Sequence, residues 1–471
     1  MAIPFPEYDT LDALALAALI GRGEVSVGEV REAALDRIRR RNPALNAVIW
    51  QPDSIHEPAV AGPFRGVPFL LKNMFVRAAG FPCTDGSRLI PADPCDQDGA
   101  FEHRLRRTGL SFLGLTNSPE FGCNATTEPR RYGPTRNPWN PTRSAGGSSG
   151  GAAAAVAARM VPVAHASDGG GSIRIPASFC GLFGLNPTRA RMPRAPGTLG
   201  LGISRDHVVS RSVRDSAALL DAVAGDEIGA AFVAPPLPGS LLAATRRPPG
   251  RLRIGVTHAI AGADPVDPAC TAAVDALAGL CAGLGHEVEG FEFLLDMAGL
   301  RDAMARRIAA GFANDFQECA AASGRWPRAD EVEPVNLAMA ELGRGVTGAE
   351  ILAGERLLQR FGRTVCEQTA RFDIVLMPVT ASPAPPLGWL STDIGVEEFW
   401  ERLCPFTDYC RIFNISGQPS ASVPVAWDGA GVPVGVQLVG RFGDETTIVA
   451  LAAQIEAAQP WAAKRPDLSV E

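Results

Sequence analysis

Two glycine- and serine-rich segments decide how this chain can be interpreted. They are SAGGSSGG at residues 144–151 and SDGGGSIRIP at residues 167–176. Each segment places a serine, Ser148 in the first and Ser172 in the second, beside consecutive glycines. Glycine allows positive φ angles and lets successive backbone N–H groups point at one small anion. The two segments therefore predict a site for an oxyanion or a phosphate.

A phosphate-binding loop and a flexible linker are the first alternatives. A phosphate loop needs the pattern Gly-x-x-x-x-Gly-Lys-Ser/Thr, and the chain has lysine only at Lys72 and Lys464, so this motif is excluded. A Gly/Ser linker remains an alternative for residues 146–151 taken alone. An alanine-rich helical pattern follows this stretch at once, and a second glycine run ends in a serine. Both observations disfavour a linker.

A second alternative is the nucleophile elbow of α/β-hydrolases. Residues 147–151 match its pattern G-x-S-x-G, which would make Ser149 the nucleophile. The elbow must follow a buried strand, but residues 139–144 are polar and interrupted by proline. It also needs a downstream histidine, and the last histidine of the chain is His286. We therefore disfavour this interpretation, and we expect His165, near the second segment, to be a buried structural residue.

The scarcity of lysine directs attention to Lys72. Only two of the 44 basic residues are lysines, and Lys72 follows the apolar run 67–71. Burial disfavours the ammonium form and can lower a lysine pKa by several units, whereas arginine stays protonated in proteins. A lysine at a strand end can also extend to solvent. Because arginine could replace lysine wherever only charge is needed, we interpret Lys72 as a general base for a serine.

The composition excludes several classes of protein. The chain has 471 residues, 46% of them hydrophobic and 20% charged, with a net charge of −7. It can therefore form a large core, and it lacks the basic character of a nucleic-acid-binding protein. No signal peptide and no apolar run of 18 residues occurs, so we expect a cytoplasmic protein outside the membrane. The ten cysteines have no metal-ligand spacing, which predicts reduced thiols and no metal site.

Short apolar runs alternate with helical patterns along the chain. Strands are expected near 67–71, 111–115, 160–164, 182–185, 252–256, 374–378, 420–425 and 434–439. Helical patterns are expected at 99–108, 150–159, 213–224, 267–284, 296–322, 347–371 and 444–458, after two helices within 9–41 that are interrupted near residue 22. This alternation predicts an α/β sandwich with a buried mixed sheet.

Several blocks together resemble the amidase signature hydrolases. Three of them are the signature blocks of the family: GVPFLLKN at 66–73, the glycine run 146–151 and the segment 168–176. Further similar blocks are TNSPEFG at 116–122, GPTRNPWN at 133–140, NISGQP at 414–419 and PVGVQ at 433–437. The resemblance implies one α/β/α domain over 1–471, with a large, mostly parallel mixed sheet covered by helices on both faces. Its expected parts are an N-terminal helical cover (1–65), a signature core (66–215) and a C-terminal half with helices around the substrate entrance (216–471).

The resemblance also implies a catalytic Ser-Ser-Lys triad. Matched block to block, Ser172 is the nucleophile, Ser148 the bridging serine and Lys72 the base. In the family a cis peptide bond precedes the bridging serine, here between Gly147 and Ser148. The expected reaction passes through an acyl-enzyme on Ser172.

Roles for the surrounding residues follow from the same resemblance. The implied oxyanion hole is formed by Gly169, Gly170 and Gly171. The implied supporting hydrogen-bond residues are Ser149, Asp168 and Arg174. Cys123 and Asn124 are candidates for the wall of the substrate cleft, for which we also expect contributions from 121–132, 200–210 and 290–410. The family usually has threonine or a larger residue at position 169, and this chain has glycine.

The function implied by the resemblance is hydrolysis of a C–N amide bond without a cofactor. Expected substrates are small to medium apolar amides, such as nylon-oligomer-like or aryl amides, with carbamates (urethanes) and esters as further candidates. The expected partners are the amide and water, and a homodimer is a candidate assembly. The alternative is a glutaminase subunit of a tRNA-dependent amidotransferase. Members of that kind carry a polar residue after the signature arginine, where this chain has Ile175.

Overall fold

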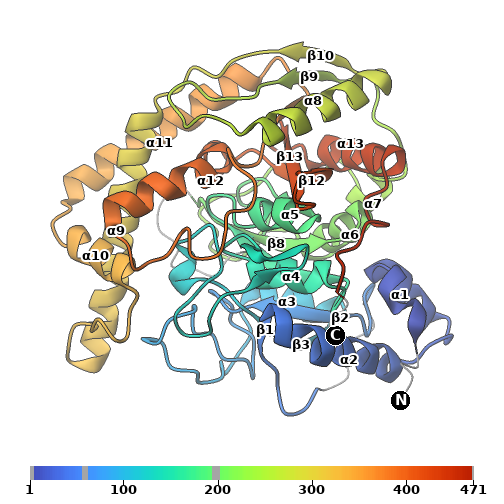
Figure 1. The fold of residues 1–471 in the computed structure, drawn as a ribbon, viewed down its shortest axis with the longest axis horizontal. Helices are drawn as coiled ribbons and strands as arrows, with labels where there is room; N and C mark the ends of the chain where they lie inside the picture. Colours follow the sequence, from blue (N-terminus) through green and yellow to red (C-terminus); the bar gives the residue numbers. More distant parts are fainter. Residues whose placement is uncertain (1–4, 56–61, 194–201, 469–471) are drawn as a thin grey trace.

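Short apolar segments form the strands of one large sheet. The computed structural model describes residues 5–55, 62–193 and 202–468, and within these residues the sheet has eleven strands in the order β1-β3-β2-β6-β8-β7-β12-β13-β11-β9-β10 (Figure 1). The strands are β1 (Val48–Trp50), β2 (Pro68–Lys72), β3 (Ser111–Thr116), β6 (Val163–Asp168), β7 (Phe183–Asn186), β8 (Arg205–Ser210), β9 (Arg253–Val256), β10 (Glu287–Gly290), β11 (Ile374–Pro378), β12 (Ser420–Trp427) and β13 (Pro433–Gly440). A separate pair is formed by β4 (Arg136–Asn137) and β5 (Asn140–Ser144).

The sheet is mixed, and its parallel pairs lie toward its two ends. Strands β3, β2 and β6 are parallel to one another, and so are β11, β9 and β10. Neighbouring strands are antiparallel throughout the central part of the sheet, which runs in the order β6-β8-β7-β12-β13-β11. The edge pair β1 and β3 is also antiparallel. The centre is thus less parallel than expected. Strands β12 and β13 are separated by only five residues, which suits a hairpin but not a parallel crossover.

Helices cover both faces of the sheet. They are α1 (Ala13–Gly21), α2 (Val27–Leu45), α3 (Ala100–Arg107), α4 (Gly150–Ala157), α5 (Arg174–Cys180), α6 (Val213–Val223), α7 (Leu241–Ala244), α8 (Pro268–Gly283), α9 (Met297–Ser323), α10 (Pro334–Gly343), α11 (Gly348–Thr369), α12 (Val396–Ser416) and α13 (Glu445–Ala458). Strand β11 shows the two layers: Ile374 and Leu376 belong to the buried cluster that contains α8 and α13, whereas Val375 and Met377 belong to the cluster that contains α9, α11 and α12. This alternation is that of a strand buried on both sides.

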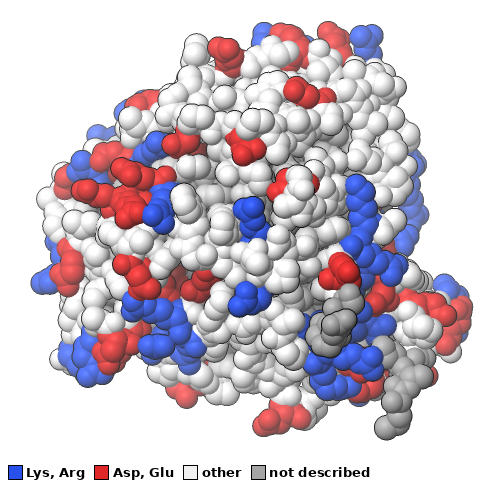
Figure 2. Space-filling view, viewed as in Figure 1, with Lys and Arg blue, Asp and Glu red and all other residues white. Residues whose placement is uncertain are grey.

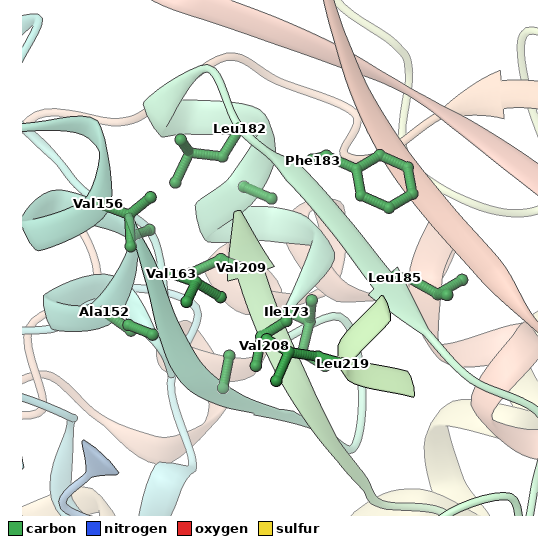
Figure 3. Close-up of a cluster of buried hydrophobic side chains, with 14 of the residues drawn as sticks. Ala152, Val156, Val163, Ile173, Leu182, Phe183, Leu185, Val208, Val209 and Leu219 are labelled. Carbon is green, nitrogen blue, oxygen red and sulfur yellow. The ribbon is translucent and has the colours of Figure 1, made fainter. Parts of the chain in front are cut away.

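A continuous apolar core supports the glycine-rich segments. Helix α4 begins at Gly150, within the last two residues of the first segment, and its alanine-rich sequence is buried along its whole length. In Figure 3, Val156 of α4, Val163 of β6, Val209 of β8 and Leu219 of α6 belong to one buried cluster. The small alanine side chains let α4 lie close to the sheet. Tight packing of this kind resists displacement of the backbone, so the segments at both ends of α4 and β6 are held in place.

Most elements with a clear local pattern agree with expectation, and several others were not predicted. The two N-terminal helices are confirmed, and α2 starts with a capping box between Ser26 and Glu29. The elements that were not predicted are helices α5, α7, α10 and α12 and strands β1, β4, β5, β8 and β10. Helix α12 contains Pro405 and is buried at nearly every position from residue 403 to residue 416. It therefore lacks the alternation of apolar and polar positions that reveals a surface helix.

The surface carries charges of both signs. On the face shown in Figure 2, acidic and basic side chains lie next to one another over the helices α9 to α11. Ion pairs in this region include Arg306 with Glu350 and Arg307 with Glu355. Within the described ranges, no helix is both long enough and apolar enough to span a membrane.

Candidate active site

Lys72 is the last residue of β2, and its side chain is fully buried. Its Nζ lies 2.8 Å from Ser148 Oγ and 2.9 Å from Ser167 Oγ, at hydrogen-bonding distance from both. Strand β6, which carries Ser167, pairs in parallel with β2. The carboxyl ends of the two strands therefore bring the lysine and this serine together. The lysine does not extend to solvent.

Ser148 reaches Lys72 from the loop that precedes α4. The peptide bond between Gly147 and Ser148 is cis, as the resemblance implies. Gly147 passes close to the backbone of Thr126, because a Cβ built on this glycine would lie 2.4 Å from the Thr126 carbonyl oxygen. Only glycine fits this approach. Ser148 is buried and fixed against the lysine amine.

Ser172 lies in the loop between β6 and α5, and its side chain is half-buried. The loop turns at Gly171, where φ is +119°. A Cβ at Gly171 would lie 2.6 Å from Ile175 Cδ1 and 2.8 Å from Cys410 Cβ, so both the backbone angle and the space require glycine. The turn presents the Ser172 side chain to a cavity that Ser148 also lines.

The Ser172 loop is anchored by a buried ion pair. Arg174 donates to both carboxylate oxygens of Asp168, from Nε at 2.9 Å and from Nη2 at 2.8 Å, and neither residue is exposed. The amide Nδ2 of Asn414 donates to the same carboxylate at 2.9 Å. Burial alone would raise the pKa of the Asp168 carboxyl, but the charge of Arg174 and these hydrogen bonds hold that pKa well below its usual range. Asp168 is therefore a structural carboxylate that stays ionised.

A cavity of about 260 Å³ opens beside the serines. Ser148, Ser167 and Ser172 lie on its wall together with Gly169 and Gly170. Apolar side chains form much of the remaining wall: Phe121, Ile175, Met304, Ile308, Phe312 and Leu403. A mainly apolar cavity with a few convergent polar groups is typical of a small-molecule site. The described residues contain no cluster of three or more His, Cys, Asp or Glu side chains that could hold a metal ion.

The similarity to known proteins extends over nearly the whole chain. The family model Amidase matches residues 29–449. The chain belongs to the amidase family. This amidase is 37% identical to the 6-aminohexanoate-cyclic-dimer hydrolase of Pseudomonas sp. (strain NK87), over 97% of this chain and 96% of that protein. The family resemblance expected from the sequence is thereby confirmed.

Solved structures agree with this assignment. The structure of 6-aminohexanoate cyclic dimer hydrolase complexed with substrate matches this amidase with a TM-score of 0.90 at 35% identity, covering 98% of this chain and 99% of that one. A bacterial aryl acylamidase of the amidase signature family matches with a TM-score of 0.85 at 27% identity, covering 97% and 99%. The expected fold class is confirmed, and the chain is an amide-hydrolysing enzyme.

Not every glycine of the expected oxyanion hole is available in this amidase. Gly169 and Gly170 line the cavity, whereas the N–H of Gly171 donates to Asp168 Oδ1 at 2.7 Å. The donor of Gly171 is thus used to close the turn, which argues against a contribution of this N–H to the expected oxyanion hole. At position 169, a Cβ would lie 2.6 Å from the Ser204 hydroxyl oxygen. Ser204 thus occupies the space into which a larger residue at 169 would extend.

The other predicted residues lie around the same site. Cys123 and Asn124 both line the cavity, and Asn124 Nδ2 also donates to the Leu390 carbonyl at 2.8 Å. Ser149 does not line it, because its hydroxyl contacts the backbone N–H and carbonyl of Ser167 at 3.3 and 3.2 Å. The cavity also draws on the expected later stretch 290–410, through residues 304–315 and 400–407. Residues 200 and 201 of the expected stretch 200–210 lie outside the described residues.

Two ionisable groups of the amidase lie near Lys72 without lining the cavity. His165 is buried beside Phe101, and its Nδ1 accepts the backbone N–H of Lys72 at 3.3 Å. Burial lowers the pKa of His165, so the neutral ring is favoured and the residue is structural, as expected. The second group is Asp85, and burial raises the pKa of its carboxyl. Burial thus disfavours the charged form of both neighbours.

Two residues of the site were not predicted from the sequence. Ser167 contacts the Lys72 amine but precedes the glycine run, and the only available signal was its place at the end of an apolar strand. Arg411 lines the cavity from α12, a helix without an amphipathic pattern. The only signal was a charged residue between apolar ones, three positions before the block 414–419 that resembles the family.

Proposed function

We propose that this amidase cleaves its substrate through an acyl-enzyme on Ser172, with Ser148 and Lys72 as a proton relay. The observation that carries the proposal is the 2.8 Å contact between Lys72 Nζ and Ser148 Oγ, at a cavity whose wall includes the half-buried Ser172. Burial disfavours the ammonium form of a lysine. The amine form can accept a proton, as a general base must.

The reaction starts with proton transfer along the relay. Lys72 takes a proton from Ser148, which takes one from Ser172, while the Ser172 oxygen attacks the amide carbonyl carbon. Backbone N–H groups of Gly169, Gly170 and Ser172 stabilise the resulting oxyanion, each donor contributing roughly 3–4 kcal/mol in the transition state. The N–H of Gly171 does not contribute, because it already donates to Asp168.

Collapse of this intermediate breaks the C–N bond. The proton held by Lys72 returns through Ser148 to the leaving amine, and the acyl group stays on Ser172. Water then attacks the ester with the same relay as base, which releases the acid and restores the serine. Asp168 and Arg174 hold the Ser172 loop in place during both steps and exchange no proton.

The cavity favours small to medium amides with apolar parts. Its wall of aromatic and aliphatic side chains suits nylon-oligomer-like and aryl amides, with carbamates and esters as weaker candidates. The similar 6-aminohexanoate-cyclic-dimer hydrolase and aryl acylamidase support these classes. Ile175 lines the cavity where a glutaminase subunit would carry a polar residue. This apolar wall argues against the glutaminase alternative.

Labelling of the nucleophile tests the proposal. A fluorophosphonate should modify Ser172, located by mass spectrometry, and Ser172→Ala should abolish both the label and anilide hydrolysis. A panel of anilides, nylon oligomers, carbamates and primary amides then ranks the substrate classes. Measurable turnover by Ser172→Ala, or a label on Ser149, would contradict the assignment.

A further inference from the structure

Arg411 places a guanidinium on the wall of the substrate cavity. The residue lies on α12, is only 4% exposed and lines the same cavity as Ser148 and Ser172. A Cβ built on Gly170 would lie 3.8 Å from Arg411 Nε. The side chain therefore extends to the loop that carries the proposed nucleophile, although the proposed mechanism gives it no role.

The protein compensates the charge of Arg411 only in part. Its Nη2 donates to Thr407 Oγ1 at 2.7 Å, and its Nη1 is 3.5 Å from Asp408 Oδ1. Asp408 is held more closely by another cation, because Arg301 donates to its Oδ2 at 2.8 Å and also contacts Asp264. Two guanidinium groups thus share the Asp408 carboxylate. The guanidinium carbon of Arg411 also lies 5.9 Å from the centre of the Trp400 ring. Within residues 5–55, 62–193 and 202–468, the hydrogen bonds of Arg411 come from Nη1 and Nη2 and none from Nε, so one donor remains for a ligand.

The surroundings favour an anion at this end of the cavity. A guanidinium beside an apolar wall is costly unless it is hydrogen-bonded, and arginine suits carboxylates in particular. Ser204 supplies a neighbouring hydroxyl. Its Oγ lies beside Gly169, and Arg411 Nε lies beside the next residue, Gly170. Among the described lining residues, the one acidic side chain is Asp315, which is exposed at the rim. An anionic group is therefore attracted to the Arg411 end and repelled at the mouth.

We propose that Arg411 binds a carboxylate on the substrate, so that the preferred amides carry a carboxylate besides the bond that is cleaved. This inference rests on the proposed function, because it takes Ser172 as the attacking group. It names the substrate class more narrowly. A neutral cyclic or aryl amide would fill the apolar wall and leave the Arg411 donor unused.

A matched substrate pair tests the inference on the unmodified enzyme. The probes are the mono-4-nitroanilide of glutaric acid and its neutral analogue, in which the free carboxylate is replaced by a carboxamide of the same shape. Release of 4-nitroaniline reports cleavage of the anilide bond alone. We expect kcat/KM to be at least about 10-fold higher for the acid, since hydrogen bonds to charged groups are roughly twice as strong as neutral ones.

Two variants assign the preference to a residue. Arg411→Gln should lower the ratio of kcat/KM between acid and carboxamide by about 10- to 100-fold, toward unity. Arg402→Gln is the control, because Arg402 lies on the same helix but contacts Glu398 and the Trp389 carbonyl instead of the cavity. It should leave the ratio unchanged. Folding of Arg411→Gln is checked through fluorophosphonate labelling of Ser172, which needs an intact site but no carboxylate.

Labelling also separates this inference from the proposed function. If neither anilide is hydrolysed, the two compounds are compared as protectants of Ser172, and the acid should slow labelling at least about 10-fold more than the carboxamide. Labelling with equal protection by both would overturn the carboxylate inference alone. A wild-type ratio at or below one, or an unchanged ratio in Arg411→Gln, would also overturn it. Absence of any label on Ser172 would overturn the proposed function, and the inference with it.

Discussion

Replacing Arg174 with methionine should destabilise the protein strongly, because it leaves a carboxylate buried without its cation. Arg174 is completely buried, donates twice to Asp168, and also donates to Gln437 Oε1 at 2.6 Å and to Ser420 Oγ at 3.0 Å. Removing one partner of a buried pair typically costs about 3–5 kcal/mol. Methionine fills part of the space but restores none of these bonds. We expect the free energy of unfolding at pH 7.5 to fall by about 3–5 kcal/mol.

The loss should depend on pH in a direction that the structure determines. In the native protein the pKa of Asp168 is lowered, so its contribution to stability is complete above the unfolded-state pKa, near 4, and decreases only in stronger acid. In Arg174→Met, burial prevails and raises that pKa above its unfolded value. When the pH is lowered from 7.5 to 5, Asp168 then becomes protonated in the folded variant, which removes the cost of the buried charge. The free energy of unfolding of the native protein does not change through Asp168 over this range, because its carboxylate stays ionised. The difference in stability should narrow by about 1–2 kcal/mol.

Urea denaturation at pH 7.5 and pH 5.0, followed by tryptophan fluorescence, measures both quantities. The control is Arg363→Met on α11, where the arginine pairs with Glu367 at 2.7 Å but its side chain is 81% exposed. That pair should contribute no more than about 0.5 kcal/mol at either pH. A loss below about 1 kcal/mol for Arg174→Met, or a loss that is equal at both pH values, would refute the reasoning.

Three further predictions concern the site. Lys72→Arg should lower kcat/KM for an anilide about 10³-fold, nearly as much as Lys72→Ala, because arginine stays protonated. The control Lys464→Arg should retain activity. An active Lys72→Arg enzyme would exclude Lys72 as the base. Ser167→Ala should lower kcat by about 10-fold. It should also move the acidic limb of the pH–rate profile to lower pH, because the Lys72 ammonium loses a hydrogen-bond acceptor and the pKa of Lys72 falls. An unmoved limb would assign Ser167 a packing role only. Gly171→Ala should lower the free energy of unfolding, measured by thermal denaturation, by about 1–3 kcal/mol, because φ at this residue is +119°. Gly170→Ala should lower it less, because a Cβ there would have its nearest contact at 3.8 Å. Equal losses in the two variants would contradict the steric argument.

The parts of the site that could be predicted have a local chemical signature. Lys72 stands out because arginine replaces lysine nearly everywhere else in the chain, and Ser148 and Ser172 stand out through their glycines. The family, the α/β fold and amide hydrolysis are confirmed by the comparisons. The 2.8 Å contact between Lys72 and Ser148 joins residues 76 positions apart that the sequence had already marked separately.

The remaining features depend on packing that no local pattern reveals. Ser167 is one hydroxyl among many, and only the pairing of β6 with β2 places it against the Lys72 amine. Gly171 appeared equivalent to its neighbours until the structure showed its N–H bound to Asp168. Arg411 lies on a helix that is buried almost all round, so neither periodicity nor charge indicated which way it points.

The contacts of Arg174 have a consequence for the order in which the protein becomes functional during synthesis. All three proposed catalytic residues lie in the first 172 residues, yet Arg174 donates to Cys410, Ser420 and Gln437, which follow it by 236 to 263 positions. A nascent chain that ends before α12 contains every catalytic group but lacks these acceptors. Contacts of such long sequence separation form late and slow folding. The anchor of the nucleophile loop is therefore completed only after nearly the whole chain has been made.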